Sequence, residues 1–212
     1  MSYCVRLMRW EDIAQVTEID REAFPTMLSP NYQRELKSPL AYYIIAYDDV
    51  RTISETGAET VLKETKRSSG LISRLLFRNK ATPSSRQYVA GFAGLWIMAG
   101  EAHIINIAVR QSYRRKGLGE LLLISLIELA AELNSFLITL EVRASNTAAQ
   151  SLYCKYGFSQ TGLRRGYYSD DKEDAVVMAV GNIESALFRE HLRRLKRAYS
   201  RKWGIALYQI TR

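Results

Sequence analysis

The sequence predicts a mixed α/β fold, a twisted sheet that contains parallel strands and carries helices on both faces. The strongest observation is segment 121–133, a helix by length and apolar composition, which lies between two strand-like segments, 104–109 and 136–142. Strand, glycine-containing turn, helix and strand in this order form a βαβ unit, whose two strands run parallel. A second observation is that alternating apolar and polar residues predict further strands around this unit.

The N-terminal part supplies the first of these elements. Residues 2–8 alternate apolar and polar side chains, which predicts a half-buried strand, and residues 11–24 carry apolar side chains at helical spacing. Two prolines then interrupt the chain. A short helix at 31–37 and a strand at 40–47 are expected to follow.

The second half of the chain completes the predicted sheet. Residues 88–98 and 102–109 flank a turn at Gly100 and predict an antiparallel hairpin. After the βαβ unit, Asn146 is expected to cap a helix that ends at Gly157. The last predicted strands are 158–163 and 175–180.

Positive charge is concentrated in two appendages. The 212-residue chain has a formal net charge of +8. Residues 50–87 carry eight basic and three acidic side chains, and residues 182–212 carry eight basic and two acidic ones. We therefore expect one domain at 1–181, interrupted by a basic insertion at about 50–87, and a basic C-terminal tail at 182–212. This distribution indicates anchoring or steering parts on a neutral body, since a nucleic-acid-binding fold would be basic throughout.

The tail predicts an amphipathic helix over 182–203. Its apolar residues step by four, three and four, at Phe188, Leu192, Leu195 and Tyr199. Arginines lie on another face, so docking on the body and binding a membrane surface or RNA phosphates fit the pattern equally well. In the insertion, apolar residues within 71–76 could form a similar surface helix, although a solvated loop is the simpler interpretation.

Composition excludes several classes of protein. The chain is 47% hydrophobic and contains 13 Tyr, 6 Phe and 3 Trp, so it can bury a core and is not disordered throughout. Two cysteines, Cys4 and Cys154, cannot form a disulfide scaffold, and the N-terminus lacks a secretory signal, so we expect a reduced, cytoplasmic protein. Because His103 and His191 are isolated in the sequence, no metal site is expected.

The segment RRKGLG at 114–119 is the first along the chain whose residues indicate a binding site. Its two glycines let the backbone approach a ligand, and the amides at the start of the following helix would attract an anion. Three adjacent cations strengthen that interpretation. The segment matches neither a Walker loop nor the dinucleotide-binding glycine pattern, and taken alone it fits a solvated turn equally well.

Several linked motifs in a characteristic order carry a resemblance to a known family. They are NIAV at 106–109, LEVRASN at 140–146, LY at 152–153, YGF at 156–158, and RRGYY at 164–168 before EDA at 173–175. With the glycine turn, this pattern resembles the GNAT family of acetyl-CoA-dependent N-acetyltransferases, and more narrowly its RimI branch. That branch acetylates the N-terminal alanine of a small-subunit ribosomal protein. The resemblance covers roughly 2–180 apart from the insertion.

The resemblance implies a GNAT fold, in which two central parallel strands, here 104–109 and 136–142, splay apart and hold acetyl-CoA between them. The pantetheine arm is expected on the backbone of Ile107, Ala108 and Val109, and on the side chain of Asn146, which could instead be a plain helix cap. The pyrophosphate is expected on the turn, at Arg114, Arg115, Lys116, Gly117, Leu118, Gly119 and Glu120.

Catalytic and acceptor-binding residues follow from the same resemblance. Glu141 matches the family's general base and Tyr153 its general acid, in a direct transfer without a covalent enzyme intermediate. A salt bridge from Glu141 to Arg143 and simple packing of Tyr153 are the structural alternatives. The acceptor peptide is expected at Phe24, Pro25, Tyr167 and Tyr168.

Two other functions remain open at this point. A GNAT enzyme could act on another amine, such as a lysine side chain or a small polyamine, and a non-catalytic acetyl-CoA-binding module could sit at the ribosome or a membrane. Residues 50–87 and 182–212 could contact RNA, the ribosome or a membrane surface. Because the tyrosine pair matches the residues that line the family's acceptor-peptide groove, a protein N-terminus fits better than a small molecule as the acceptor.

Overall fold

The computed structural model describes residues 3–53, 59–61, 86–204 and 207–209, and the nine strands in this part of the chain form one mixed sheet. Their spatial order is β7-β8-β6-β5-β4-β2-β1-β9, with β3 paired to β2. The strands are β1 (Tyr3–Leu7), β2 (Ala41–Ile53), β3 (Glu59–Val61), β4 (Arg86–Met98), β5 (Glu101–Val109), β6 (Leu137–Arg143), β7 (Ser159–Arg164), β8 (Ala175–Gly181) and β9 (Leu207–Gln209).

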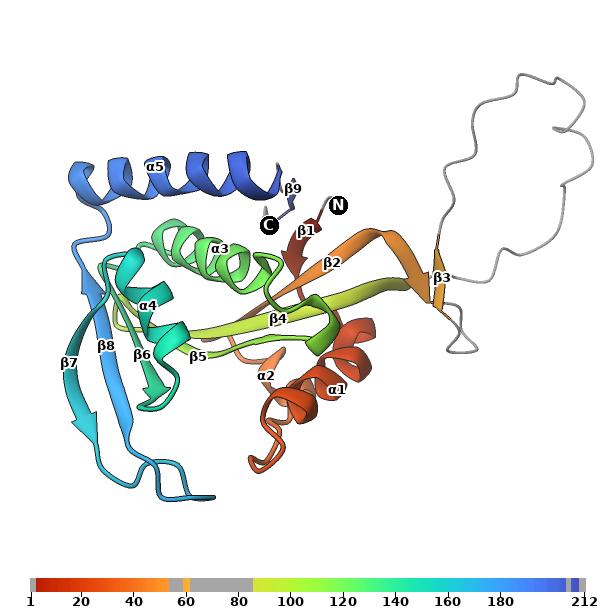
Figure 1. The fold of residues 1–212 in the computed structure, drawn as a ribbon, viewed down its shortest axis with the longest axis horizontal. Coiled ribbons are helices and arrows are strands. Elements are labelled where there is room, and N and C mark those ends of the chain that lie inside the picture. The colour runs from red at the N-terminus through yellow and green to blue at the C-terminus, as the bar shows by residue number, and fades with distance from the viewer. Residues whose placement is uncertain (1–2, 54–58, 62–85, 205–206, 210–212) are drawn as a thin grey trace, which may run out of the picture.

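Helices cover both faces of this sheet (Figure 1). Those of the α type are α1 (Ile13–Ala23), α2 (Tyr32–Glu35), α3 (Leu118–Glu132), α4 (Thr147–Lys155) and α5 (Ala186–Trp203). Two short 3₁₀ turns, η1 (Trp10–Asp12) and η2 (Gln111–Tyr113), precede α1 and α3. α1 and α2 lie on one face, whereas α3 and α4 lie on the other with α5 outside α3. The predicted mixed sheet with helices on both faces is therefore confirmed.

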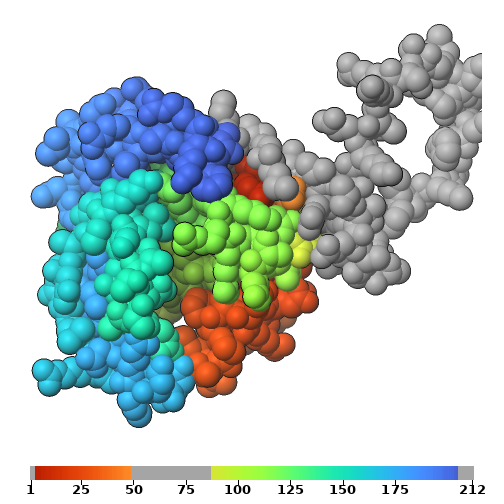
Figure 2. Space-filling model, in the orientation of Figure 1, coloured from red at the N-terminus to blue at the C-terminus, as the bar shows by residue number. Residues whose placement is uncertain are grey.

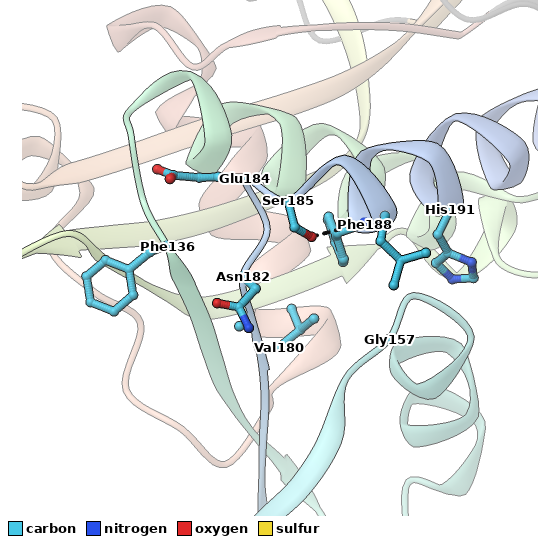
Figure 3. Close-up of a pocket in the computed structure, with 10 residues that line it drawn as sticks. Phe136, Gly157, Val180, Asn182, Glu184, Ser185, Phe188 and His191 are labelled. Carbon is cyan, nitrogen blue, oxygen red and sulfur yellow. Dashed lines mark hydrogen bonds between the residues drawn. The ribbon is translucent and has the colours of Figure 1, made fainter.

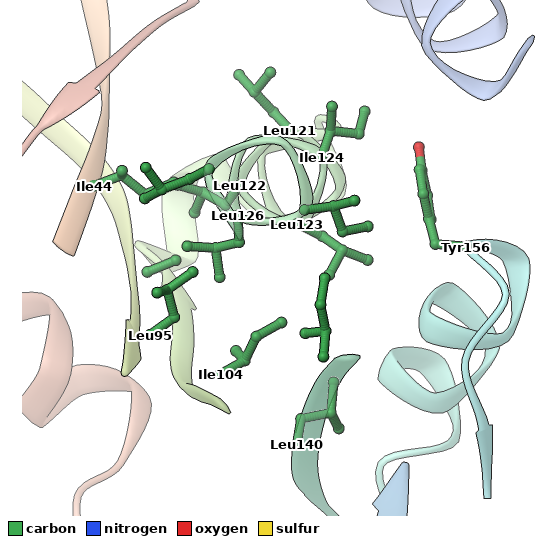
Figure 4. Close-up of a cluster of buried hydrophobic side chains, with 14 of the residues drawn as sticks. Ile44, Leu95, Ile104, Leu121, Leu122, Leu123, Ile124, Leu126, Leu140 and Tyr156 are labelled. Carbon is green, nitrogen blue, oxygen red and sulfur yellow. The ribbon is translucent and has the colours of Figure 1, made fainter. Parts of the chain in front are cut away.

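The larger core surrounds α3, which is apolar on nearly all sides. Figure 4 shows its leucines and isoleucines between Ile44, Leu95, Ile104 and Leu140 of the sheet and Tyr156 after α4. A helix that is apolar all round must be covered on its outer side as well as on its sheet side. Each fully buried leucine contributes about 1.5–3 kcal/mol, so this helix is a major source of stability.

α5 supplies that outer cover. Tyr199 is buried, and Phe188, Leu192, Leu195 and Trp203 pack against the α3 core. Lys196 forms an ion pair with Glu128 of α3, and Figure 2 shows α5, in blue, lying across the body. Of the alternatives left open by the tail sequence, docking on the body is the one observed.

The two central parallel strands separate along their length. β5 and β6 are paired only from Glu101 with Leu137 to Ile104 with Leu140. Beyond those pairs, β5 continues to Val109 and β6 to Arg143 without pairing to each other. β5 remains bonded to β4 on its other side, so its edge toward β6 keeps unpaired backbone groups. This is the splay expected from the resemblance.

The chain departs from prediction where the basic insertion was expected to begin. β2 continues to Ile53, and its last residues, Thr52 and Ile53, pair with Gln87 and Arg86 of β4. Backbone pairing with β4 therefore extends the strand through residues whose composition indicated a loop. β3 adds a short strand there, whereas the apolar stretch within 71–76 lies outside the described residues.

Candidate active site

A cavity of about 430 Å³ lies at the splay, walled by α1 and the chain that follows it, β5, β6, α4 and the segment after β7. Its volume suits a ligand rather than a few waters. The cavity brings together many residues predicted from distant parts of the sequence. They are Phe24, Ile107, Glu141, Asn146, Tyr153, Tyr167 and Tyr168. Pro25 is not among the residues that line it.

Glu141 sits at the base of the cavity with its side chain only 9% exposed. Strand alternation buries Leu140 and Val142 in the α3 core and turns Glu141 to the opposite face. Its Oε1 atom lies 3.0 Å from a guanidinium nitrogen of Arg164, and its Oε2 atom lies 3.1 Å from Nε2 of His103. The carboxylate is thus held by two partners, neither of which is the Arg143 that the sequence suggested as an alternative.

Arg143 instead organises the segment after β7. Its guanidinium binds Asp170 at 2.6 Å, Asp171 at 2.8 Å and Glu173 at 2.9 Å. It also lies 4.0 Å from the ring centre of Tyr168. Hydrogen bonds from Arg143 lower the pKa of the Asp170 carboxyl. This cluster fixes one wall of the cavity, and a hydrogen bond from Thr26 to Asp170 links it to the chain after α1.

Tyr153 faces the cavity from α4 and packs on Phe158, with ring centres 5.9 Å apart. Burial raises the pKa of its phenol to about 12, with a smaller contribution from Tyr168. Tyr153 therefore keeps its proton at neutral pH, as a general acid must.

Asn146 caps α4, because its Oδ1 atom accepts a hydrogen bond from the Ala149 amide at 3.1 Å. The capping role that the sequence left as an alternative is therefore real. Since Asn146 also lines the cavity, its side-chain NH₂ group is the part that could meet a ligand.

The glycine turn lies apart from this cavity, at the start of α3. Gly117 is the helix N-cap, with φ at +83°, and Arg115 also has a positive φ of 62°. Trp203 of α5 packs on Gly117, since a Cβ there would lie 2.9 Å from the indole. A Cβ on Gly119 would meet nothing within 4 Å, so space is open beside the first turn of α3. The amides of that turn have no acceptors within the helix, which makes it suited to an anion.

Side chains around the turn are largely engaged within the protein. Lys116 Nζ donates to the Ser112 carbonyl at 2.8 Å, and Arg114 Nε donates to the Val109 carbonyl at 3.2 Å. Glu120 accepts from Tyr156 at 2.7 Å and pairs with Lys155, which ties α3 to α4. Most of the predicted cofactor-binding residues do not line the cavity. They are Ala108, Val109, Arg114, Arg115, Lys116, Gly117, Leu118, Gly119 and Glu120. A ligand touching both places would have to be extended.

Sequence reasoning gave no role to two titratable residues that line the cavity, His103 and Asp20, or to Arg164, which binds Glu141. His103 looked isolated because its partners are distant in sequence. The signal that could have found it is the βαβ register: His103 pairs with Thr139, and Glu141 lies two residues farther along the same face. Asp20 is a buried carboxylate of α1, only 4% exposed.

A second hollow lies where β8 passes into α5 (Figure 3). It is lined by Phe136, Val180, Phe188 and His191, and Ser185 caps the helix beside it through the Phe188 amide at 3.2 Å. It contains none of the predicted site residues. Across the described ranges, no group of three or more His, Cys, Asp or Glu side chains is placed to hold a metal ion. The part of the chain that was searched also contains no helix long and apolar enough to cross a bilayer.

These features together define a class of protein. A sheet split between parallel strands, a carboxylate and a protonated tyrosine in the split, and an open helix start farther along are the parts of a group-transfer enzyme with an extended donor. The chain belongs to the acetyltransferase (GNAT) family, whose sequence pattern matches residues 10–158. The family and fold expected from the motifs are thereby confirmed.

Known proteins of this family resemble the chain over most of its length. A protein of Bacillus subtilis (strain 168), classed by name as a ribosomal protein bS18-alanine N-acetyltransferase, is 34% identical over 178 residues, which are 83% of this chain and 93% of that protein. The crystal structure of the ribosomal-protein-S18-alanine N-acetyltransferase from Escherichia coli matches with a TM-score of 0.62 and 25% identity, over 85% of this chain and 94% of that one.

A more distant solved structure shares the fold. Arabidopsis thaliana NAA60, crystallised in complex with acetyl-CoA, matches with a TM-score of 0.63 and 15% identity, over 85% of this chain and 98% of that one.

Proposed function

We propose that the chain transfers an acetyl group from acetyl-CoA to the α-amino group of a protein N-terminus, and that its acceptor is the N-terminal alanine of ribosomal protein bS18. The observation that carries the proposal is the buried Glu141 at the base of a cavity walled by Phe24, Tyr167 and Tyr168. The similarity to a bS18-alanine N-acetyltransferase over most of both chains supports the acceptor. Such an acceptor implies a cytoplasmic enzyme.

The residues of the split fit an extended thioester donor. Acetyl-CoA, when bound, supplies the activated acetyl group. The backbone of β5 at Ile107, Ala108 and Val109 is not paired to β6, which suits the amides of a pantetheine arm, although the Val109 carbonyl already accepts from Arg114. Amides from Arg115 to Glu120 would hold the pyrophosphate beside the open space at Gly119.

Proton transfer is assigned to two side chains. An α-ammonium has a pKa of about 7.7–8.0, so Glu141 has only a loosely held proton to remove before the amine attacks. Tyr153, protonated at neutral pH, lines the cavity from α4 and would donate its proton to the departing sulfur. Direct attack needs no enzyme nucleophile, and the side chain of Cys154 is exposed.

Contact with the ribosome is proposed through α5. Its apolar face packs against the α3 core, so that face is already occupied and is not free to insert into a membrane, although Leu187 at the start of the helix is exposed. Its solvent side carries exposed cations suited to RNA phosphates. They are Arg189, Arg193, Arg194, Arg197, Arg201 and Lys202. The side chains of 50–86 lie outside the described residues, so their part in such a contact stays a prediction.

The test is a thiol-release assay with acetyl-CoA and a short peptide that begins with Ala-Arg. A matched peptide has a blocked α-amino group and a free lysine. We expect turnover on the free terminus alone and a loss of about 10²–10⁴-fold in kcat/KM for Glu141→Gln. Turnover on the lysine peptide or on spermidine would contradict the proposed acceptor. If the protein bound acetyl-CoA but acetylated no amine, the alternative of a non-catalytic binding module would be supported.

The ribosomal contact is tested in the same assay with small ribosomal subunits as the acceptor. Their acetylation should weaken steeply with salt, and reversing Arg193 and Arg197 to Glu should flatten that dependence while the free peptide is still acetylated normally. An unchanged salt dependence would contradict the α5 contact.

A further inference from the structure

We propose that His103 is the proton outlet of the active site, receiving from Glu141 the proton taken from the acceptor amine and passing it to solvent. This inference rests on the proposed function, because it needs Glu141 to act as the base. His103 acts through Glu141 and is therefore a positioning residue in the proton path. The family pattern quoted above contains no role for it.

The geometry places His103 between Glu141 and the exterior. Its Nε2 atom lies 3.1 Å from Oε2 of Glu141, and its Nδ1 atom lies 2.9 Å from Oγ1 of Thr139. The His103 side chain is 37% exposed, whereas that of Glu141 is 9% exposed. Glu141 reaches little solvent compared with His103, so His103 offers a proton on Glu141 a more exposed neighbour through which to leave.

The Thr139 hydroxyl lets the His103 ring gain or lose a proton without changing its position. A hydroxyl both donates and accepts, so it can bond Nδ1 whether or not that nitrogen carries hydrogen. With hydrogen on Nδ1, the bare Nε2 atom can accept a proton from Glu141, and the charged ring then donates to both neighbours. Imidazole is also the side chain whose ordinary pKa lies closest to neutral pH.

Other charged and titratable groups face the pair. Arg164 binds the second oxygen of Glu141, so its guanidinium fixes the carboxylate while the first oxygen stays in contact with His103. Arg143, Tyr168 and Asp20 line the same cavity, and Trp96 is the β4 residue paired with His103. Among these, His103 is the group that can exchange a proton with Glu141 by direct contact.

The acceptor amine loses two protons, and no further reactant is needed for either. The second, lost as the amide forms, replaces the proton that Tyr153 gives to the departing sulfur, and the first follows the path proposed here. An ammonium N–H bond breaks and an O–H bond forms on Glu141, which leaves a neutral amine to attack the thioester. The O–H bond then breaks as an N–H bond forms on Nε2 of His103. Solvent water takes the proton from the imidazolium, and both side chains return to their starting states.

The experiment compares His103→Ala and His103→Gln with His191→Ala, which removes the other histidine from the surface of α5. Glutamine can still hydrogen-bond Glu141 and Thr139 but cannot carry a proton at neutral pH. We expect both His103 variants to lose about tenfold to a hundredfold in kcat at pH 7 with an unchanged KM for acetyl-CoA, and His191→Ala to match the wild type.

Chemical rescue separates a relay from a structural role. Imidazole at tens of millimolar should restore kcat in His103→Ala, where it can occupy the vacated space, and should not restore it in His103→Gln. Wild-type activity in His103→Gln, or absence of rescue in a folded His103→Ala variant, would overturn the relay.

The wild-type controls separate this inference from the proposed function. Wild-type turnover on a lysine peptide alone would remove the proposed acceptor and leave the relay testable on that amine. Full activity of Glu141→Gln would overturn both the base and the relay, as would absence of wild-type turnover on every amine.

Discussion

The two ends of the split sheet are built on different principles. At the proposed acceptor end, the site is made of side chains: Glu141 is held by Arg164 and His103, and Tyr153 lines the same cavity from α4. At the proposed cofactor end, the site is made mostly of backbone: the amides at the start of α3 lie beside Gly119, and the side chain of Glu120 is bonded to Tyr156 after α4.

This difference teaches where each end is vulnerable. At the acceptor end, a substitution that removes or replaces a single functional group should change the rate of proton transfer and leave the fold intact. At the cofactor end, side-chain identity should matter less than shape, because Trp203 packs directly on Gly117. The tail helix, which the family motifs do not include, is thereby part of the support of the cofactor end.

Among the variants that compare the two ends, Tyr153→Phe at the acceptor end should have the largest effect. The substitution removes the phenolic oxygen and keeps the ring that packs on Phe158, so stability should change little. We expect kcat to fall about 10²-fold, with an unchanged KM for acetyl-CoA, because the departing sulfur loses its proton donor. Cys154→Ala is the matched control on the same helix, and a comparable loss there would favour a covalent intermediate instead.

An intermediate effect is expected from the two glycines of the cofactor end. Gly117→Ala combines a left-handed backbone, φ +83°, with a Cβ only 2.9 Å from the Trp203 ring, and should lower stability by about 1–3 kcal/mol. Gly119→Ala enters open space in a helix and should unfold no more easily than the wild type. Its cost should appear instead as a higher Kd for acetyl-CoA, since the new methyl occupies the space beside the helix start.

Thermal unfolding and isothermal titration with acetyl-CoA separate these two outcomes. Adding Trp203→Ala should reduce the loss caused by Gly117→Ala, because it removes the steric clash and leaves only the backbone strain. An acetyl-CoA affinity unaffected by Gly119→Ala would contradict the placement of the pyrophosphate.

Local patterns predicted the order of most elements, although not β3 or β9, and the family resemblance implied the separated strands and singled out Glu141, Tyr153 and Asn146. The missed contacts depend on register or on long-range packing. His103 meets Glu141 because β5 and β6 pair through His103 and Thr139, which are 36 positions apart. Docking of α5 was left open because its amphipathic pattern fits several partners, although an α3 apolar on all sides was a signal that something must cover it.

The smallest effect concerns the wall built on Arg143, and it depends on pH. Hydrogen bonds from Arg143 lower the pKa of both Asp170 and Glu173 below their ordinary values. Carboxyls with a lowered pKa in the folded state stabilise it above their unfolded pKa of about 4, and this contribution is lost as the pH falls through the folded value. Acidification below about pH 4 should therefore loosen the segment at 165–174 before the body unfolds.

Amide hydrogen exchange of that segment, corrected for the intrinsic effect of pH, measures the loosening. Protection should fall on acidification in the wild type, whereas in Arg143→Gln it should be low already at pH 6 and change little below pH 4. Because the segment carries Tyr167 and Tyr168, that variant should also raise the KM for the acceptor peptide a few-fold while leaving the Kd for acetyl-CoA unchanged. If Arg143→Gln weakened the binding of the acceptor peptide and of acetyl-CoA equally, the two ends of the split would be mechanically coupled. That result would contradict the separate roles of the two ends.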